Sequence, residues 1–146
     1  MNYLKGGVWL RREYPINCLD TDLLIAILRG KKDAYSKVLA IDEEAKGAAT
    51  TAINTFEILF GAYKSKMQSE NLKETLRLLD RLNVIPLDFS SSKKAAEISA
   101  KLGAIGEPID YRDTMIAAIA LENDLTLVTH NKSHFSRIKN LKLETW

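Results

Sequence analysis

Short apolar runs alternate with longer segments of helical spacing along the 146-residue chain. The short runs are typical of buried strands, whereas the longer segments place apolar residues three and four positions apart, as on one face of a helix. The strands that we expect cover residues 16–19, 48–51, 84–88, 125–129 and 142–146. Strands that alternate with helices predict an α/β fold, a three-layer α/β/α sandwich around a mostly parallel sheet of about five strands.

Several boundaries of the expected helices carry recognisable signals. One helix over residues 22–28 ends before Gly30, and a second over residues 34–44 is followed by Gly47. Serines open the helix that ends near Gly103, and a strongly apolar helix follows over residues 111–124. The predicted apolar face of residues 52–66 comprises Ile53, Phe56, Leu59, Phe60 and Tyr63, and that of the next helix, capped by Ser69, comprises Leu72, Leu76 and Leu79.

Composition and charge place few restrictions on function. A hydrophobic content of 46% and a charged content of 27% are ordinary for one globular domain, which we assign to residues 16–146. Residues 1–15 form an N-terminal extension with no assigned function. No apolar run reaches the roughly 18 residues of a membrane span, so we expect a cytoplasmic protein. The net charge of +2 does not by itself indicate nucleic-acid binding, and the single Cys18 can form no intrachain disulfide.

Acidic side chains recur where the predicted strands end. Asp20 and Asp22 follow the first strand, Glu57 lies in an otherwise apolar helix after the second, and Asp113 opens the helix before residues 125–129. The carboxyl ends of parallel strands share one crevice, so we expect these acids to converge. Converging carboxylates repel one another and bind hard cations such as Mg²⁺ or Mn²⁺. Thr129 and Asn131 follow the fourth strand at the same edge.

Each acid also has a purely structural interpretation. Asp22 suits an N-cap or a first helical turn, and Asp113 suits a first turn capped by Asp110. Glu57 can pair with a lysine further along its own helix, at Lys64 or Lys66. With one cysteine and two histidines, a zinc site is not expected, and we interpret His130 and His134 as surface or positioning residues. Basic residues that suit RNA phosphates, or simply a solvated surface, are Arg29, Lys31, Lys32, Arg112, Lys132 and Arg137.

The segments CLDTDLLIAILRG, TTAINTFEILFGA, GEPIDYRDTMIAAIALENDLTLVTHNKSHFSRI and LKLETW resemble the PIN-domain ribonucleases, specifically the VapC-type toxins of toxin–antitoxin pairs. The resemblance covers residues 16–146 in order and spacing. It implies that Asp20, Glu57 and Asp113 bind the metal. It also implies that Thr129 and Asn131 position water or phosphate, although Asn131 stands where many relatives have an acid. Asp22 falls on a position of lesser importance.

The function implied by the resemblance is metal-dependent endonucleolytic cleavage of RNA, with Mg²⁺ or Mn²⁺ as the cofactor. The expected partners are the RNA substrate, a cognate VapB-type antitoxin that covers the active-site groove, and a second copy of the chain in a homodimer. No membrane is expected to take part. Candidates for the apolar groove, which equally suit a core, are Leu24, Leu28, Leu59, Phe60 and Tyr63.

Two other functions remain open from the residues alone. The LDTD segment also resembles the D-x-D motif of haloacid-dehalogenase-type phosphatases, in which Asp20 would be the nucleophile and Asp22 the general acid. That chemistry has no use for Glu57 and needs a late acidic pair that the sequence lacks. The second alternative is a non-catalytic protein-binding α/β module, in which the acids are helix caps.

Overall fold

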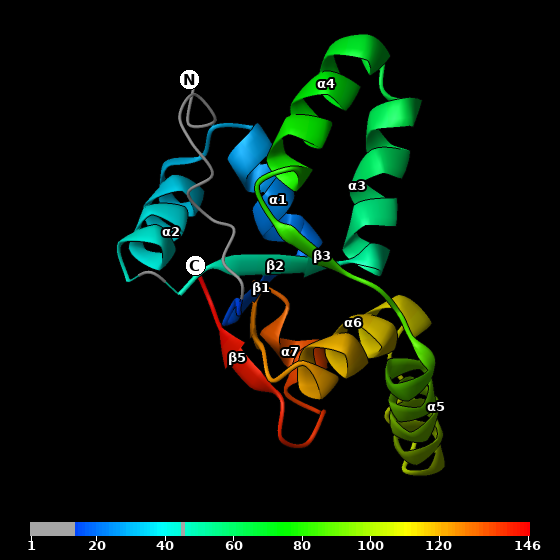
Figure 1. Cartoon of the computed structure of the whole chain (residues 1–146). Coiled ribbons are helices and arrows are strands. Elements are labelled where there is room, and N and C mark those ends of the chain that lie inside the picture. Colours follow the sequence, from blue (N-terminus) through cyan, green and yellow to red (C-terminus); the bar gives the residue numbers. More distant parts are fainter. Residues whose placement is uncertain (1–13, 45) are drawn as a thin grey trace.

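A five-stranded parallel sheet forms the centre of the computed structural model, which describes residues 14–44 and 46–146 (Figure 1). The strand order is β3-β2-β1-β4-β5, and every neighbouring pair is parallel. This confirms the predicted α/β fold, with a sheet that is parallel throughout. The strands are β1 (Asn17–Leu19), β2 (Ala48–Thr51), β3 (Asn83–Ile85), β4 (Thr126–Val128) and β5 (Lys142–Glu144).

Helices cover both faces of the sheet. Helices α1 to α4 lie on one side and α5 to α7 on the other, which gives the three predicted layers (Figure 1). The helices are α1 (Thr21–Leu28), α2 (Lys32–Glu43), α3 (Ala52–Lys64), α4 (Gln68–Leu79), α5 (Phe89–Ala104), α6 (Tyr111–Glu122) and α7 (Lys132–Phe135).

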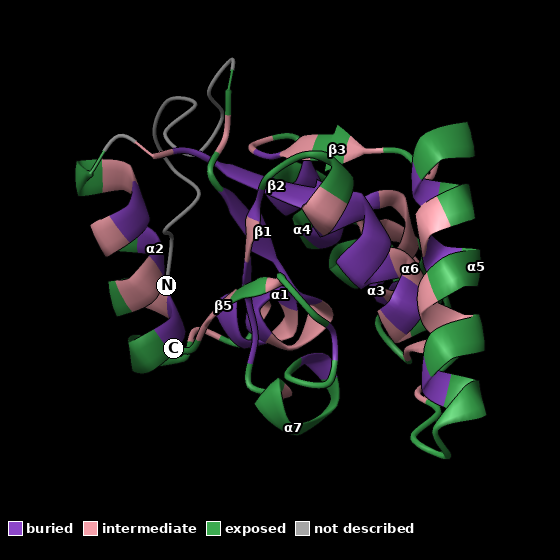
Figure 2. Ribbon diagram, turned by 90° about the horizontal axis from the view of Figure 1, so that it is seen from below, coloured by how far each residue is buried: buried purple, intermediate pink, exposed green. Residues whose placement is uncertain are grey.

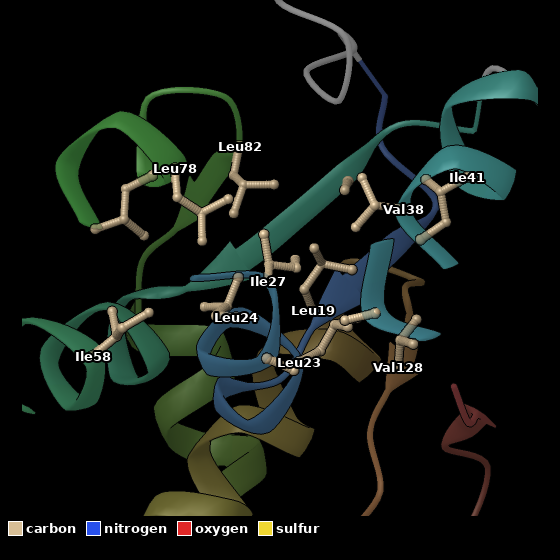
Figure 3. Packing of buried hydrophobic residues seen from close by; sticks show 14 residues of the cluster. Leu19, Leu23, Leu24, Ile27, Val38, Ile41, Ile58, Leu78, Leu82 and Val128 are labelled. Atoms are coloured by element: carbon tan, nitrogen blue, oxygen red, sulfur yellow. The ribbon is translucent and has the colours of Figure 1, made fainter. Parts of the chain in front are cut away.

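Two hydrophobic clusters pack against opposite faces of the sheet because successive strand side chains point to opposite sides. Leu19 and Val128 belong to the cluster beneath α1, α2 and α4, where Figure 3 shows them near Leu23. Their strand neighbours Cys18 and Leu127 belong to the other cluster, beneath α6 and α7. Burial raises the pKa of the Cys18 thiol, so this cysteine is a core residue.

Helix α6 is buried through its middle because it lies between the sheet and α5. Its buried residues are Thr114 and the run Ile116–Ala120. Helix α5 is exposed along its outer side, as Figure 2 shows in green. Across residues 14–44 and 46–146, the structure contains no helix with the length and apolar character needed to span a bilayer.

Several predicted boundaries differ from the structure; the last strand, for example, ends at Glu144 rather than at residue 146. Strand β3 covers Asn83–Ile85 rather than residues 84–88, since the chain leaves the sheet at Pro86, which has no N–H to donate. Helix α4 begins at Gln68 without a side-chain cap, so the predicted Ser69 cap is absent. Helix α5 is capped by Asp88, whose side chain accepts a hydrogen bond from the backbone N–H of Ser91.

The predicted apolar face of α3 is wrong in part: Ile53 and Leu59 are partly buried against the hydrophobic clusters, but the other three residues are not. Asn54, Ile58 and Ala62 are the residues of α3 that are buried, whereas Phe56, Phe60 and Tyr63 are exposed. The apolar pattern misled because the buried stripe contains a polar residue, Asn54, whose hydrogen bonds are satisfied inside the protein. In α4 the buried residues are Thr75, Leu78 and Leu79, while Leu76 is exposed.

Candidate metal-binding active site

The site lies where β1, β2 and β4 end, because α1 and α3 begin directly after β1 and β2. Asp20 is the N-cap of α1, and its side chain accepts a hydrogen bond from the backbone N–H of Thr21. Thr51 is the N-cap of α3 and forms a capping box with Asn54. These two caps hold the first turns of both helices at one edge of the sheet.

Asp20 is buried, with 7% of its surface exposed, yet every side-chain oxygen has a partner. Its Oδ1 accepts hydrogen bonds from the Thr21 backbone and from Asn54 Nδ2, each at 2.9 Å. Its Oδ2 accepts one from Thr129 Oγ1 at 2.6 Å. The pKa of Asp20 is raised to about 6, chiefly by burial; the hydrogen bond from Thr129 lowers it, the charge of Asp22 raises it, and the hydrogen bonds from Thr21 and Asn54 lower it. A nearby positive charge would therefore stabilise the ionised form.

Glu57 follows Asn54 by one helical turn and is linked to Asp20 through two polar side chains. Its Oε1 accepts a hydrogen bond from Thr21 Oγ1 at 3.0 Å. The same hydroxyl oxygen accepts one from Asn54 Nδ2 at 2.9 Å. Glu57 Oε2 lies 3.6 Å from Arg112 Nη1, so the cationic partner that the structure gives it comes from α6.

Asp113 lies in the first turn of α6, which is capped by Asp110 as the sequence suggested. Its Oδ2 lies 3.4 Å from His134 Nδ1. The same His134 nitrogen lies 3.1 Å from Asn131 Nδ2. Burial raises the pKa of Asp113, as it does for Asp20. Helix α7 therefore connects Asp113 to the end of β4.

Thr129 connects the two aspartates that follow β1. It is fully buried, and its hydroxyl oxygen accepts a hydrogen bond from the Asn131 backbone at 2.9 Å while its proton goes to Asp20. Asp22 lies in the first turn of α1 rather than at its N-cap. Its Oδ2 accepts a hydrogen bond from the His130 backbone at 2.9 Å.

The structure links Asp20 with Glu57 through Thr21, and Asp113 with Asn131 through His134. In the part of the chain that the structure describes, no three carboxylate, histidine or cysteine side chains lie close enough to enclose an ion as they stand. The donor atoms nevertheless suit a hard divalent cation, since all are carboxylate oxygens and the ionised form of Asp20 is disfavoured by burial. The exposed guanidinium of Arg112 is the positive group beside Glu57, and the imidazole of His134 lies beside Asp113.

Sequence reasoning missed Thr21 and Asn54, which hold the carboxylates in place. Asn54 stands three residues after Thr51 and three before Glu57. The spacing from Thr51 is that of a capping box and was the one available signal for Asn54. Thr21 carried no signal, because its role depends on a helix 33 to 36 residues further along the chain.

A cleft of about 350 Å³ opens beside Glu57, between α1, α3 and α4. Leu28 and Arg29 line it, whereas Leu24 is part of the core. Phe60 and Tyr63 are exposed on α3. A larger cavity of about 700 Å³ lies between α5 and residues 137–140, and none of the predicted metal ligands lines it.

Comparison with known proteins decides the family. The family model of the PIN domain matches residues 18–141. The chain belongs to the PIN-domain family. The Rickettsia felis protein named ribonuclease VapC2 is 30% identical to it over 131 residues, covering 90% of this chain and 98% of the relative.

Two further comparisons place this PIN domain among VapC proteins. The Shigella flexneri protein named tRNA(fMet)-specific endonuclease VapC is 27% identical over 128 residues, which is 88% of this chain and 96% of that protein. The crystal structure of VapBC2 from Rickettsia felis bound to a promoter DNA fragment superposes with a TM-score of 0.82 at 30% identity. That match covers 90% of this chain and 98% of the other. The phosphatase and non-catalytic alternatives find no support in these comparisons.

Proposed function

We propose that this PIN domain is the toxin of a VapBC-type toxin–antitoxin pair and acts as a metal-dependent endoribonuclease. The observation that carries the proposal is the buried Asp20 carboxylate, held by Asn54 and Thr129 where β1, β2 and β4 end. The ribonuclease names of the VapC relatives support RNA as the substrate. An RNA substrate in turn suits a cytoplasmic site of action.

Asp20, Glu57 and Asp113 are the residues that would hold the metal. Their oxygen donors suit Mg²⁺ or Mn²⁺, which bind carboxylates and keep several water ligands. Burial raises the pKa of both Asp20 and Asp113, so their ionised forms are disfavoured in the absence of a counter-charge. A divalent cation supplies that positive charge, and the stabilisation of the two ionised carboxylates favours its binding.

Cleavage would proceed by attack of water on the scissile phosphorus. The bond to the 3′ oxygen breaks, which leaves a 3′-hydroxyl and a 5′-phosphate. When bound, the metal activates the water and neutralises charge that develops on the phosphate. Thr129 fixes the orientation of Asp20 through its 2.6 Å hydrogen bond, and Asn131 positions the water or a phosphate oxygen. Arg112, 58% exposed and beside Glu57, binds a backbone phosphate of the RNA.

The cleft beside Glu57 is the surface that we assign to the antitoxin. Ile25 and Leu28 give it an apolar wall, and Arg29 and Glu57 give it charged groups. An antitoxin segment that occupies this cleft would cover Glu57 and exclude RNA. The related Rickettsia felis protein was crystallised as a VapBC complex, which supports a VapB-type partner. We further propose that the chain forms a homodimer, as the resemblance to VapC toxins implies.

RNA cleavage by the purified protein tests the proposal. Single-stranded RNA and tRNA(fMet), the RNA in the name of the Shigella flexneri relative, are incubated with Mg²⁺ or with EDTA. We expect cleavage only with Mg²⁺, and a loss of at least about 100-fold in Asp20→Asn, Glu57→Gln and Asp113→Asn. Glu107→Gln is the matched control, because Glu107 is an exposed acid shortly before α6.

Two results would contradict the assignment: cleavage in EDTA, or full activity in all three ligand variants. Expression in cells gives an independent test of the toxin role. Growth should stop when the wild-type protein is produced alone and should resume when a small protein encoded immediately upstream is produced with it. Growth arrest by the Asp20→Asn variant would show that the toxicity does not come from the proposed nuclease site.

A further inference from the structure

Trp146 lies against the end of β4, far along the chain from the proposed metal ligands. Its indole ring stacks on the imidazole of His130, with ring centroids 3.5 Å apart and an angle of 14° between the planes. His130 Nε2 lies 2.6 Å from the main-chain oxygen of Trp146, which can only accept. Two interactions therefore hold His130 and Trp146 together. Trp146 also packs against the core cluster that contains Leu19 and Val128.

The contacts of Trp146 lead back to Asp20 through Asp22. Trp146 Nε1 lies 3.4 Å from Asp22 Oδ1. The other oxygen of Asp22 accepts a hydrogen bond from the His130 backbone at 2.9 Å and lies 3.3 Å from Thr129 Oγ1. Trp146 and His130 thus hold both oxygens of Asp22, and Asp22 in turn faces the hydroxyl that is bonded to Asp20.

The Thr129 hydroxyl has one proton and two carboxylates within reach. It lies 2.6 Å from Asp20 Oδ2 and 3.3 Å from Asp22 Oδ2, so Asp20 is the acceptor in this structure. A cation held by Asp20 would compete with that proton for the lone pairs of the carboxylate. If Asp22 stays in place, the Thr129 proton has a second acceptor, and Asp20 can turn its oxygen to a cation without leaving the hydroxyl unpaired.

We propose that Trp146 is a positioning residue, which holds Asp22 as the alternative acceptor for the Thr129 hydroxyl and so favours cation binding at Asp20. This inference rests on the proposed function, because it concerns the same metal site. It gives Asp22 a defined role: Asp22 accepts the Thr129 hydrogen bond when Asp20 no longer does. It also connects the end of the described chain to the site through contacts that the strand order alone does not reveal.

A double-mutant cycle on Mn²⁺ affinity, measured by isothermal titration calorimetry, tests the role of Trp146. We expect Trp146→Ala and Asp22→Asn each to weaken Mn²⁺ binding about tenfold, the lower end of the range for residues that support metal ligands. The double variant should lose no more than either single variant, because both act through one hydrogen bond. Trp146→Phe keeps a ring on His130 but removes the N–H that reaches Asp22 Oδ1, so it should weaken Mn²⁺ binding about as much as Trp146→Ala. Lys142→Ala is the control, since Lys142 lies on the adjacent β5 and pairs with Asp124.

Fluorescence gives a second measurement that does not depend on Trp146→Ala folding. The chain has two tryptophans, so Trp9→Phe leaves Trp146 as the single emitter. We expect its emission to change when Mg²⁺ is added, and the change to disappear in Asp20→Asn. Emission that stays constant at saturating Mg²⁺ would overturn the connection between Trp146 and the site.

The outcomes separate this inference from the proposed function. Unchanged Mn²⁺ affinity in Trp146→Ala would overturn the positioning role alone. So would two tenfold losses that multiply to about 100-fold in the double variant. Mn²⁺ binding by the wild type without cleavage of any RNA would overturn the ribonuclease assignment alone. A wild-type protein that binds no Mn²⁺ would overturn both.

Discussion

Asp20→Asn should make the protein more stable at neutral pH while it removes the proposed metal site. Asp20 is buried, and burial raises the pKa of its carboxyl to about 6 from an ordinary value of 3.8. The Asp20 carboxyl therefore keeps its proton up to a higher pH in the folded state than in the unfolded chain. Asparagine has the same shape, can cap α1 in the same way and can still accept the hydrogen bond from Asn54.

The size of the effect follows from the difference in pKa. Between pH 4 and pH 6 the folded state binds more protons than the unfolded state, so the free energy of unfolding falls as the pH rises. The pKa of Asp20 is about two units higher in the folded state than in the unfolded chain. At 1.36 kcal/mol per unit, ionised Asp20 lowers the free energy of unfolding by about 3 kcal/mol at pH 7. Below pH 4 the Asp20 carboxyl is protonated in both the folded and the unfolded state, so the cost of burying its charge disappears. We therefore expect the free energy of unfolding of Asp20→Asn to exceed that of the wild type by roughly 2 to 3 kcal/mol at pH 7 and to equal it near pH 4.

Urea unfolding at several pH values in the presence of EDTA measures this difference. In thermal scans the same gain corresponds to a rise in Tm of roughly 5 to 10 °C at pH 7. Addition of Mn²⁺ should stabilise the wild type but not the variant, since a ligand stabilises only the state that binds it. The reasoning would be refuted if Asp20→Asn were less stable than the wild type at pH 7, or if its advantage were the same at pH 4.

Three further results are expected. Apparent Mn²⁺ affinity should fall about tenfold per pH unit below pH 6, because a proton on Asp20 competes with the cation, and calorimetry between pH 5 and pH 7.5 checks this. Asn54→Ala should lower the free energy of unfolding by about 1 to 3 kcal/mol, since it removes the side chain that completes the Thr51 capping box and leaves buried groups unpaired. Asn71→Ala, at an exposed site, should have little effect in the same urea titration. Arg112→Ala should raise the KM for RNA about tenfold with little change in kcat, and the KM should depend less on salt concentration. Arg77→Ala, on the exposed side of α4, is the control. A KM that stays constant would remove Arg112 from the substrate site.

The alternation of strands and helices was enough to predict the layers and to place the acids at one edge of the sheet. Parallel strands end at the same edge of the sheet. Asp20 and Thr129 directly follow the neighbouring strands β1 and β4, so they lie close together irrespective of the loop conformations. The first-turn position of Asp113 and its Asp110 cap also followed from local sequence, because capping depends on residues within one helical turn.

Contacts between distant segments could not be predicted in the same way. The buried face of α3 depends on Asn54, which is polar and therefore absent from any hydrophobic pattern. Its burial is possible because Asp20 and Thr21 accept its amide protons, and both lie more than 30 residues away. The stack of Trp146 on His130 likewise needs the register of β5 beside β4, which side-chain types do not determine.

Mn²⁺ titration of the wild type and of the three ligand variants tests the central claim most directly, because it asks whether Asp20, Glu57 and Asp113 form one site. We predict saturable binding by the wild type and by the Glu107→Gln control, with affinity at least about tenfold weaker in Asp20→Asn, Glu57→Gln and Asp113→Asn. Wild-type affinity in both Glu57→Gln and Asp113→Asn would contradict the account, because Asp20 would then bind the ion without the other two carboxylates.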